Sequence, residues 1–248
     1  MIGTLVALSA FAGEGDFDHS HAALGAFLQG AVSDRGVDYG MLASRRPQLD
    51  AYLASIRDVS TDGWTPAQRL ALAVNAYNAL TLSVVLDGGP PKSIMDLDGG
   101  QVWKARHFVV GGQDVTLDAL ENAQARKLAD GRVHAVLNCA SRGCPPLPPK
   151  PLSAATVDAQ LDEAARHWAS TNAWTLQGDQ LKLSKIFEWY SADFTKENHG
   201  DLPGLDGNAE NAVWFLSRFV DAATAERLKG GGLTVGWTDY DWTLNLAP

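Results

Sequence analysis

The segment from Thr65 to Pro91 constrains the fold most, because it carries both the start and the stop signals of one long helix. Thr65 can cap a helix N-terminus, and Pro66 suits the first helical position. A helix that begins there runs to about Leu86 and ends in the sequence Asp-Gly-Gly-Pro-Pro. We expect this helix to be the strongest element of the chain.

Shorter helices are predicted around this long helix, and most strands are predicted in pairs. The helices are expected over residues 21–32, 46–56, 117–128, 153–170, 185–194 and 208–229. The strands are expected at 103–110 with 115–117, at 173–176 with 180–183, at 133–137 and at 233–237. Because helices outnumber strands and do not alternate with them regularly, the sequence predicts an α+β fold. The fold should be mostly helical, with short β-hairpins and a small, mainly antiparallel sheet.

The charge of the chain argues against two classes of partner. The formal net charge is -9, whereas nucleic acids and anionic lipid head groups both require a basic face. The sequence has no run of about 18 apolar residues, so we expect no membrane span. We also expect no metal and no cofactor, because HExxH, paired CxxC, DxDxDG, Gly-rich phosphate-loop and GxSxG motifs are all missing.

The first residues favour export from the cell. Residues 2–12 are apolar and end in Ala-Phe-Ala, the small-x-small pattern of a signal cleavage site, although no basic segment precedes them. We therefore expect residues 1–19 to be an N-terminal arm or a signal-peptide remnant, and residues 20–248 to form a single domain. Export to the periplasm or beyond would place the cysteines in an oxidising compartment, where they could pair.

The only two cysteines, Cys139 and Cys144, follow the short apolar run at 133–137. A strand there would deliver Cys139 to a loop of small and polar residues, where folds commonly expose their chemistry. Two interpretations stay open. Cys139 is a nucleophile with a lowered pKa, or the two cysteines are structural, as a disulfide or as buried thiols.

A nucleophilic Cys139 needs a base and an acid nearby. His134 is the nearest histidine, but an odd separation puts the two side chains on opposite faces of a regular strand. They can meet only if the strand bulges or ends first. His107 in the preceding hairpin is the second candidate base. Glu121, on the helix before the strand, could orient an imidazole and complete the logic of a catalytic triad.

Polar residues inside two predicted helices need explanation. Asn75 and Asn78 lie on one face of the long helix, and buried amides require polar partners. They either tie backbone loops together, which we favour, or bind a substrate amide. The aromatic stripe at residues 187–194 is typical of core packing, so Asp193, which lies inside it, should also have a polar partner.

The last segment, residues 240–245, is expected to form a strand or turn that docks the C-terminus against the rest of the domain.

Several segments form one ordered pattern along the chain. They are Asn75–Leu82, Leu117–Glu121, Arg132–Leu147, Leu183–Phe194 and Tyr240–Asn245, with Gly36–Tyr39 before them. In this order they resemble the DUF547 family, a domain of unknown function. The family occurs in bacterial, often exported, proteins and in plants behind coiled-coil segments. The resemblance extends over nearly the whole chain, from Ser20 to Asn245.

The bacterial pattern of this family, Cys-x-Ser-x-x-Cys-Pro, is matched at residues 139–145, with Ser141 as its serine. Plant members keep the first cysteine but not the second, which argues against a purely structural disulfide, and they often lack the histidine at position 134. The resemblance also implies a papain-like arrangement in which Glu and His precede Cys. That order maps onto Glu121, His134 and Cys139.

We therefore hypothesise a thiol-dependent hydrolase or acyl-transferase that acts on a peptide-like substrate. Cys139 is its nucleophile, His134 its base and Glu121 the orienting acid. The predicted substrate-binding residues are Asn75, Asn78, Ser141 and Trp103. The alternative is a non-catalytic module that binds a peptide, a thiol-containing small ligand or a glycan in the same groove, with Cys139 and Cys144 paired.

Overall fold

The computed structural model describes residues 17–248, so the apolar run at residues 2–12 lies outside the described part of the chain. Within this part the protein has an α+β fold that is mostly helical and carries three small sheets. This confirms the predicted fold class. The strands pair as β1–β2, β3–β4 and β5–β6, all antiparallel, and β7 adds to β6 in parallel.

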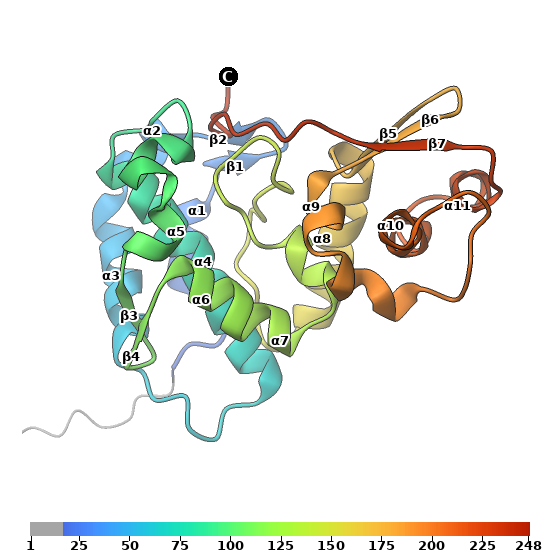
Figure 1. Ribbon diagram of the computed structural model, residues 1–248. Helices are drawn as coiled ribbons and strands as arrows, with labels where there is room; N and C mark the ends of the chain where they lie inside the picture. Colours follow the sequence, from blue (N-terminus) through green and yellow to red (C-terminus); the bar gives the residue numbers. More distant parts are fainter. Residues whose placement is uncertain (1–16) are drawn as a thin grey trace, which may run out of the picture.

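The elements follow one another closely (Figure 1). The α-helices are α1 (Ala22–Leu28), α2 (Tyr39–Ser44), α3 (Arg46–Arg57), α4 (Pro66–Asp87), α5 (Val102–Ala105), α6 (Leu117–Ala119), α7 (Arg126–Leu128), α8 (Val157–Thr171), α9 (Lys185–Trp189), α10 (Gly207–Ser217) and α11 (Ala222–Lys229). Tighter or wider helical turns are η1 (Ile94–Gly100), η2 (Leu120–Ala125), η3 (Gly131–Ala135) and η4 (Ser191–Glu197). The strands are β1 (Val32–Ser33), β2 (Gly36–Val37), β3 (Phe108–Val110), β4 (Gln113–Val115), β5 (Trp174–Gln177), β6 (Gln180–Leu183) and β7 (Thr234–Trp237).

Helix α4 is the centre of the first hydrophobic core and begins where the sequence predicts. Thr65 Oγ1 accepts from the backbone of Gln68, and the Gln68 side chain accepts from the backbone N–H of Thr65. Every residue from Leu70 to Val85 is buried, so the helix is covered on all sides. It is long and apolar enough to cross a membrane, but 89% of its apolar window is buried within the fold, as a core helix must be.

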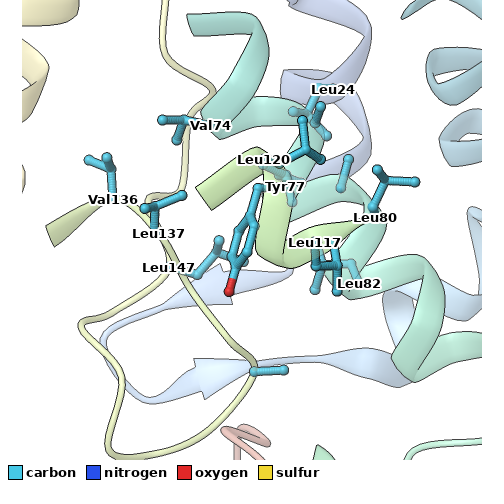
Figure 2. Packing of buried hydrophobic residues seen from close by; sticks show 14 of the residues in the cluster. Leu24, Val74, Tyr77, Leu80, Leu82, Leu117, Leu120, Val136, Leu137 and Leu147 are labelled. Carbon is cyan, nitrogen blue, oxygen red and sulfur yellow. The ribbon is translucent and has the colours of Figure 1, made fainter. Parts of the chain in front are cut away.

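Tyr77 of α4 is fully buried in the first core. Figure 2 shows its ring among the side chains of Leu120, Leu137 and Leu147, which come from η2 and from the loop after η3. These three leucines are far from α4 in the sequence. Tyr77 therefore joins the central helix to the two segments that carry the predicted site.

A second core lies between α8, α9, α10 and the β5–β6–β7 sheet (Figure 1, yellow to red). Trp168 stacks on Phe187 with ring centroids 4.6 Å apart, and Phe194 contacts Phe215 at 4.9 Å. The predicted aromatic stripe at residues 187–194 is confirmed as core packing for these two phenylalanines. Each ring contributes a large apolar area, which stabilises this half of the molecule.

The C-terminal segment ties separate parts of the chain together. After β7 the chain runs back across the molecule and ends near β2 (Figure 1, red). Its backbone forms hydrogen bonds with two loops and with β2: Arg142 N–H donates to Thr243 O at 2.8 Å, Leu244 N–H to Lys92 O at 2.8 Å, and Val37 N–H to Asn245 O at 2.8 Å. The expected docking of residues 240–245 is confirmed.

The strand predicted at residues 133–137 is wrong. The chain forms the short 3-10 helix η3 there, which Asp130 caps by accepting from the backbone N–H of Arg132 at 3.1 Å. A short buried apolar run fits a tight helix as well as a strand, so periodicity alone could not decide. Gly131 is required at the start of η3, because a Cβ there would lie 2.5 Å from the Phe194 ring.

The strand predicted at residues 103–110 is shorter than expected, since only residues 108–110 are extended.

Asn75 supplies a direct test of how α4 is anchored. Its side chain donates to Leu152 O at 2.8 Å and accepts from Leu152 N–H at 2.9 Å, and it is buried. We expect Asn75→Ala to lower the free energy of unfolding by about 2–3 kcal/mol, because two buried backbone groups lose their partners. Urea denaturation followed by tryptophan fluorescence measures the change. The exposed Asn208→Ala, the same chemical change, should shift stability by less than about 0.5 kcal/mol; equal losses would contradict the assignment.

Candidate functional site

One cavity of about 380 Å³ brings together most of the residues predicted for catalysis. Glu121, His134, Cys139 and Trp103 all line it, although they come from η2, η3, the loop after η3 and α5. The other lining residues are Tyr77, Lys104, Asp118, Asn122, Leu137, Cys144, Ile186, Trp189, Tyr190, Tyr240 and Trp242. The predicted acid, imidazole and thiol positions therefore all face one cavity.

Both cysteines of the chain form a disulfide on the wall of this cavity. The Cα atoms of Cys139 and Cys144 are 6.2 Å apart, within the usual range for a disulfide. The hydroxyl oxygen of Tyr240 lies 3.1 Å from each sulfur atom, and Ser141 Oγ lies 3.1 Å from Cys139 Sγ. Cys139 is half-buried and Cys144 is buried, so the first sulfur is the one nearer to a ligand.

A buried amide network fixes the loop that carries the disulfide. Asn138 donates its backbone N–H to Asn78 Oδ1 at 2.9 Å and its side-chain Nδ2 to Pro145 O at 2.8 Å. Its Oδ1 accepts from the backbone N–H of Ala140 at 2.9 Å. Ala140 has a φ of 61°, a left-handed conformation that costs energy for any residue with a side chain. Sequence analysis missed Asn138; its position directly before Cys139 was the available signal.

Several of the predicted binding residues lie elsewhere or face other groups. Asn75 and Asn78 hydrogen bond to backbone and are not among the cavity-lining residues. Ser141 is buried and donates to the Tyr240 hydroxyl at 2.9 Å. His107, the second candidate base, is exposed, pairs with Asp114 at 2.9 Å and is not a lining residue. Their roles toward a ligand stay predictions.

Asp193, and not Glu121, is the carboxylate that contacts His134. The His134 Nε2 atom lies 2.8 Å from Asp193 Oδ2, and Arg126 Nε donates to the same oxygen at 2.5 Å. Burial raises the pKa of Asp193, but the hydrogen bonds from His134 and Arg126 outweigh it and bring the pKa to about 2. An ionised carboxylate only accepts hydrogen bonds, so Nε2 carries a proton and Nδ1 is the nitrogen left to act as a base.

Aromatic rings hold the imidazole of His134 in place. Its ring centroid lies 4.4 Å from that of Tyr190 and 5.3 Å from that of Phe194, and its side chain is 3% exposed. Asp193 was expected to need a partner because it lies in an aromatic stripe, and His134 and Arg126 are those partners. The imidazole is therefore fixed in position and in tautomer by Tyr190, which lies between α9 and η4, and by Asp193 and Phe194 of η4.

Glu121 places a negative charge among phenols at the inner end of this site. Burial, and then the nearby Glu121 carboxylate, raise the pKa values of Tyr77 and Tyr190 above the ordinary value. Both phenols therefore stay protonated at neutral pH. Tyr77 and Tyr190 also hydrogen bond to Glu121, and Arg126 interacts with it electrostatically. Among residues 17–248, none of the salt bridges of the structure includes Glu121.

Four aromatic side chains form a continuous wall, which we call the aromatic rim: Trp103, Trp189, Tyr240 and Trp242. The ring centroids of Tyr240 and Trp242 lie 4.5 Å apart, those of Trp189 and Tyr240 4.8 Å apart, and those of Trp103 and Trp242 6.0 Å apart. Trp189 is 48% exposed, which is unusual for so large an apolar side chain. Gly143 allows this packing, because a Cβ there would lie 2.9 Å from the Tyr240 ring.

The described residues offer no evident metal centre. Within residues 17–248, no group of three or more His, Cys, Asp or Glu side chains is arranged to hold a metal ion. The polar groups of the cavity are instead spread among aromatic rings, a pattern typical of sites for organic ligands.

Residues 61–168 match the family model described as "Protein of unknown function, DUF547". This match confirms the resemblance to DUF547 over that part of the chain. The DUF547 match contains Glu121, His134 and both cysteines, whereas the resembling segments at residues 183–194 and 240–245 lie beyond it. Comparisons with curated proteins and with solved structures find no match. The DUF547 family therefore supplies a name for the site but not a function.

The pairing of Asp193 predicts a pH-dependent contribution to stability. Because the folded pKa of about 2 lies below the unfolded value, ionised Asp193 stabilises the fold above about pH 4, and this is lost as pH falls through 2. We expect Asp193→Asn to be destabilised by about 2 kcal/mol at pH 7, with the difference from wild type about half as large at pH 3. Urea unfolding across this range measures it; a difference independent of pH would contradict the ionic role.

Proposed function

We propose that this protein is a non-catalytic binding module whose cavity holds a peptide-like ligand, with the Cys139–Cys144 disulfide as a fixed part of the wall. The observation that carries the proposal is that six aromatic residues and this disulfide line one cavity of about 380 Å³. That size, and a lining rich in aromatic side chains with a few polar groups, are typical of sites for small organic ligands.

The aromatic rim supports binding for energetic reasons. Trp and Tyr side chains offer large contact areas with few rotatable bonds, so little conformational entropy is lost when a ligand packs on them. The half-exposed Trp189 leaves apolar surface that a ligand would remove from water. Glu121 and Asn122 supply polar groups that can fix the orientation of a ligand.

The disulfide argues for binding over catalysis while it is intact. A sulfur in a disulfide is not a thiolate, so Cys139 in this state cannot be the nucleophile of a hydrolase. Disulfides persist in oxidising compartments, so the proposal includes export to the periplasm or beyond. A mass spectrum of the protein isolated from its natural compartment without reductant should show both cysteines oxidised; two free thiols there would contradict this part of the proposal.

Binding should depend on the rim and not on a thiol. The probes are blocked dipeptides of the form N-acetyl-X-Ala-amide, in which X is each of the 20 common amino acids in turn. We expect some of them to show saturation-transfer NMR signals with the intact protein. Trp242→Ala should weaken their binding about tenfold or more, because it removes a central ring of the wall. Trp214→Ala, outside the cavity, is the matched control.

The cysteines provide the second arm of the same experiment. We expect the double variant Cys139→Ser, Cys144→Ser to keep binding within about threefold, after correction for the lost stability of the disulfide. Loss of binding on removing both thiols, with the fold intact by circular dichroism, would count against a thiol-independent site. Absence of binding by every dipeptide would overturn the proposal as a whole.

A second candidate is a thiol-dependent hydrolase or acyl-transferase that works in the reduced state. The observation that favours it is that Cys139 and His134 line the same cavity, with Asp193 orienting the imidazole as in an acid–imidazole–thiol triad. In this mechanism His134 Nδ1 takes the thiol proton and the thiolate attacks the carbonyl carbon of the substrate. The leaving group departs with that proton, and water or an acceptor then cleaves the thioester.

Cys144→Ser separates the two candidates, because it frees Cys139 without a reductant. For an enzyme, this variant should turn over p-nitrophenyl acetate, and adding Cys139→Ser or His134→Ala should lower the rate about 100-fold or more. Iodoacetamide labelling across pH should then give a Cys139 pKa well below about 8.5, the value of an unperturbed thiol. No turnover together with an unperturbed pKa would leave the binding module as the function.

A further inference from the structure

We infer that the cavity selects a ligand bearing an alkylammonium group, as in the lysine side chain of a peptide. This inference rests on the proposed binding function and names its ligand class. It is carried by the juxtaposition of the Glu121 carboxylate, which lacks an ion-pair partner among residues 17–248, with six aromatic residues in one cavity.

The basic groups around the cavity are already engaged. Lys104 Nζ lies 4.0 Å from Asp118 Oδ1 at the mouth of the cavity. Arg126 donates to Asp193 at 2.5 Å and to the side-chain oxygen of Asn122. These pairings neutralise Asp118 and Asp193 and leave the negative charge of Glu121 for a ligand. Arg126 also interacts electrostatically with Glu121, but its guanidinium donates to other acceptors, so the Glu121 carboxylate can still attract a cation that enters the cavity.

The aromatic walls suit a cation as well. The negative face of an aromatic ring attracts a cation, most strongly for Trp, and the attraction grows where water is excluded. The protein already uses one wall in this way, since the guanidinium carbon of Arg126 lies 4.7 Å from the centroid of the Tyr190 ring. Trp189, Tyr240 and Trp242 contact one another on the other side and provide further ring faces. A neutral glycan would stack on these rings without needing the carboxylate.

A matched pair of probes tests this inference on the full-length, disulfide-bonded protein. N-acetyl-lysine methylamide and N-acetyl-norleucine methylamide share the same unbranched four-carbon side chain, and only the first adds an ammonium group. We expect the lysine probe to bind about tenfold more tightly by titration calorimetry at low salt. Glu121→Gln should remove most of that preference, measured as the ratio of the two affinities in the same variant.

Two measurements guard against trivial explanations. Asp62→Asn removes an exposed carboxylate outside the cavity and should keep the preference, which separates a local effect from the net charge of the chain. In the wild-type protein the preference should also shrink as NaCl rises from about 0.05 to about 0.5 M, because salt screens the ammonium–carboxylate attraction. This second measurement needs no variant, so it stands even if Glu121→Gln unfolds.

The outcomes distinguish the inference from the proposal on which it rests. Equal affinities for the two probes in wild type, or a preference that Glu121→Gln leaves unchanged, would overturn the ammonium inference while binding in the cavity stands. A preference abolished equally by Asp62→Asn would overturn it too, because the effect would then be one of net charge. If neither probe nor any blocked dipeptide binds, the proposed binding function itself fails.

Discussion

The site depends on one buried contact, the pair of hydrogen bonds by which Asn78 of α4 holds the chain on either side of Leu137. Asn78 Nδ2 donates to Val136 O at 2.8 Å, and its Oδ1 accepts from the backbone N–H of Asn138 at 2.9 Å. An amide buried in a helix interior is costly unless both of its polar atoms are paired, so this contact fixes the loop against the central helix. Asn138 then extends the network, since its Oδ1 accepts from Asn245 Nδ2 at 3.1 Å. The buried central helix thus positions the disulfide loop and, through it, the C-terminal segment.

The cavity forms where the two hydrophobic cores meet, which explains why its residues come from so many elements. Tyr77 and Leu137 belong to the first core, whereas Ile186 belongs to the second. The contact between His134 and Asp193 crosses this boundary, and it is supported where Gly131 allows Phe194 to approach the start of η3. A polar pair in such a position is held by packing on both sides, so its geometry varies little. Each half of the molecule contributes walls that the other half could not supply.

Patterns within a few residues of one another predicted the helices and strands. The site, in contrast, depends on contacts between residues far apart in the sequence, which no local pattern reveals. The capping box at Thr65 was readable because all its atoms lie within one helical turn. The position of Glu121 before His134 suggested Glu121 as the orienting acid, whereas the carboxylate that contacts the imidazole is Asp193, 59 positions along the chain from His134. The sequence did indicate that Asp193 needed a partner, but no local pattern could identify it. Trp242 was expected only to dock the C-terminus, since its place in the aromatic rim follows from the return of the chain after β7.

The oxidation state of Cys139 decides which chemistry this cavity can perform. Paired with Cys144, the sulfur is an uncharged part of an aromatic wall, and the Tyr240 hydroxyl lies 3.1 Å from both sulfur atoms. Reduction would place a titratable thiol beside the same hydroxyl, in a cavity that already holds the charge of Glu121. A second negative charge there is disfavoured by Coulomb repulsion unless an imidazolium balances it. An ammonium ligand and a thiolate nucleophile therefore require different charges in the cavity. The ligand requires the Glu121 carboxylate without a positive charge beside it, whereas the thiolate requires a protonated His134 close by. With the disulfide intact, the cavity needs no positive charge to balance a thiolate, so Glu121 can attract an ammonium ligand. This is the physical reason to prefer binding while the disulfide is intact.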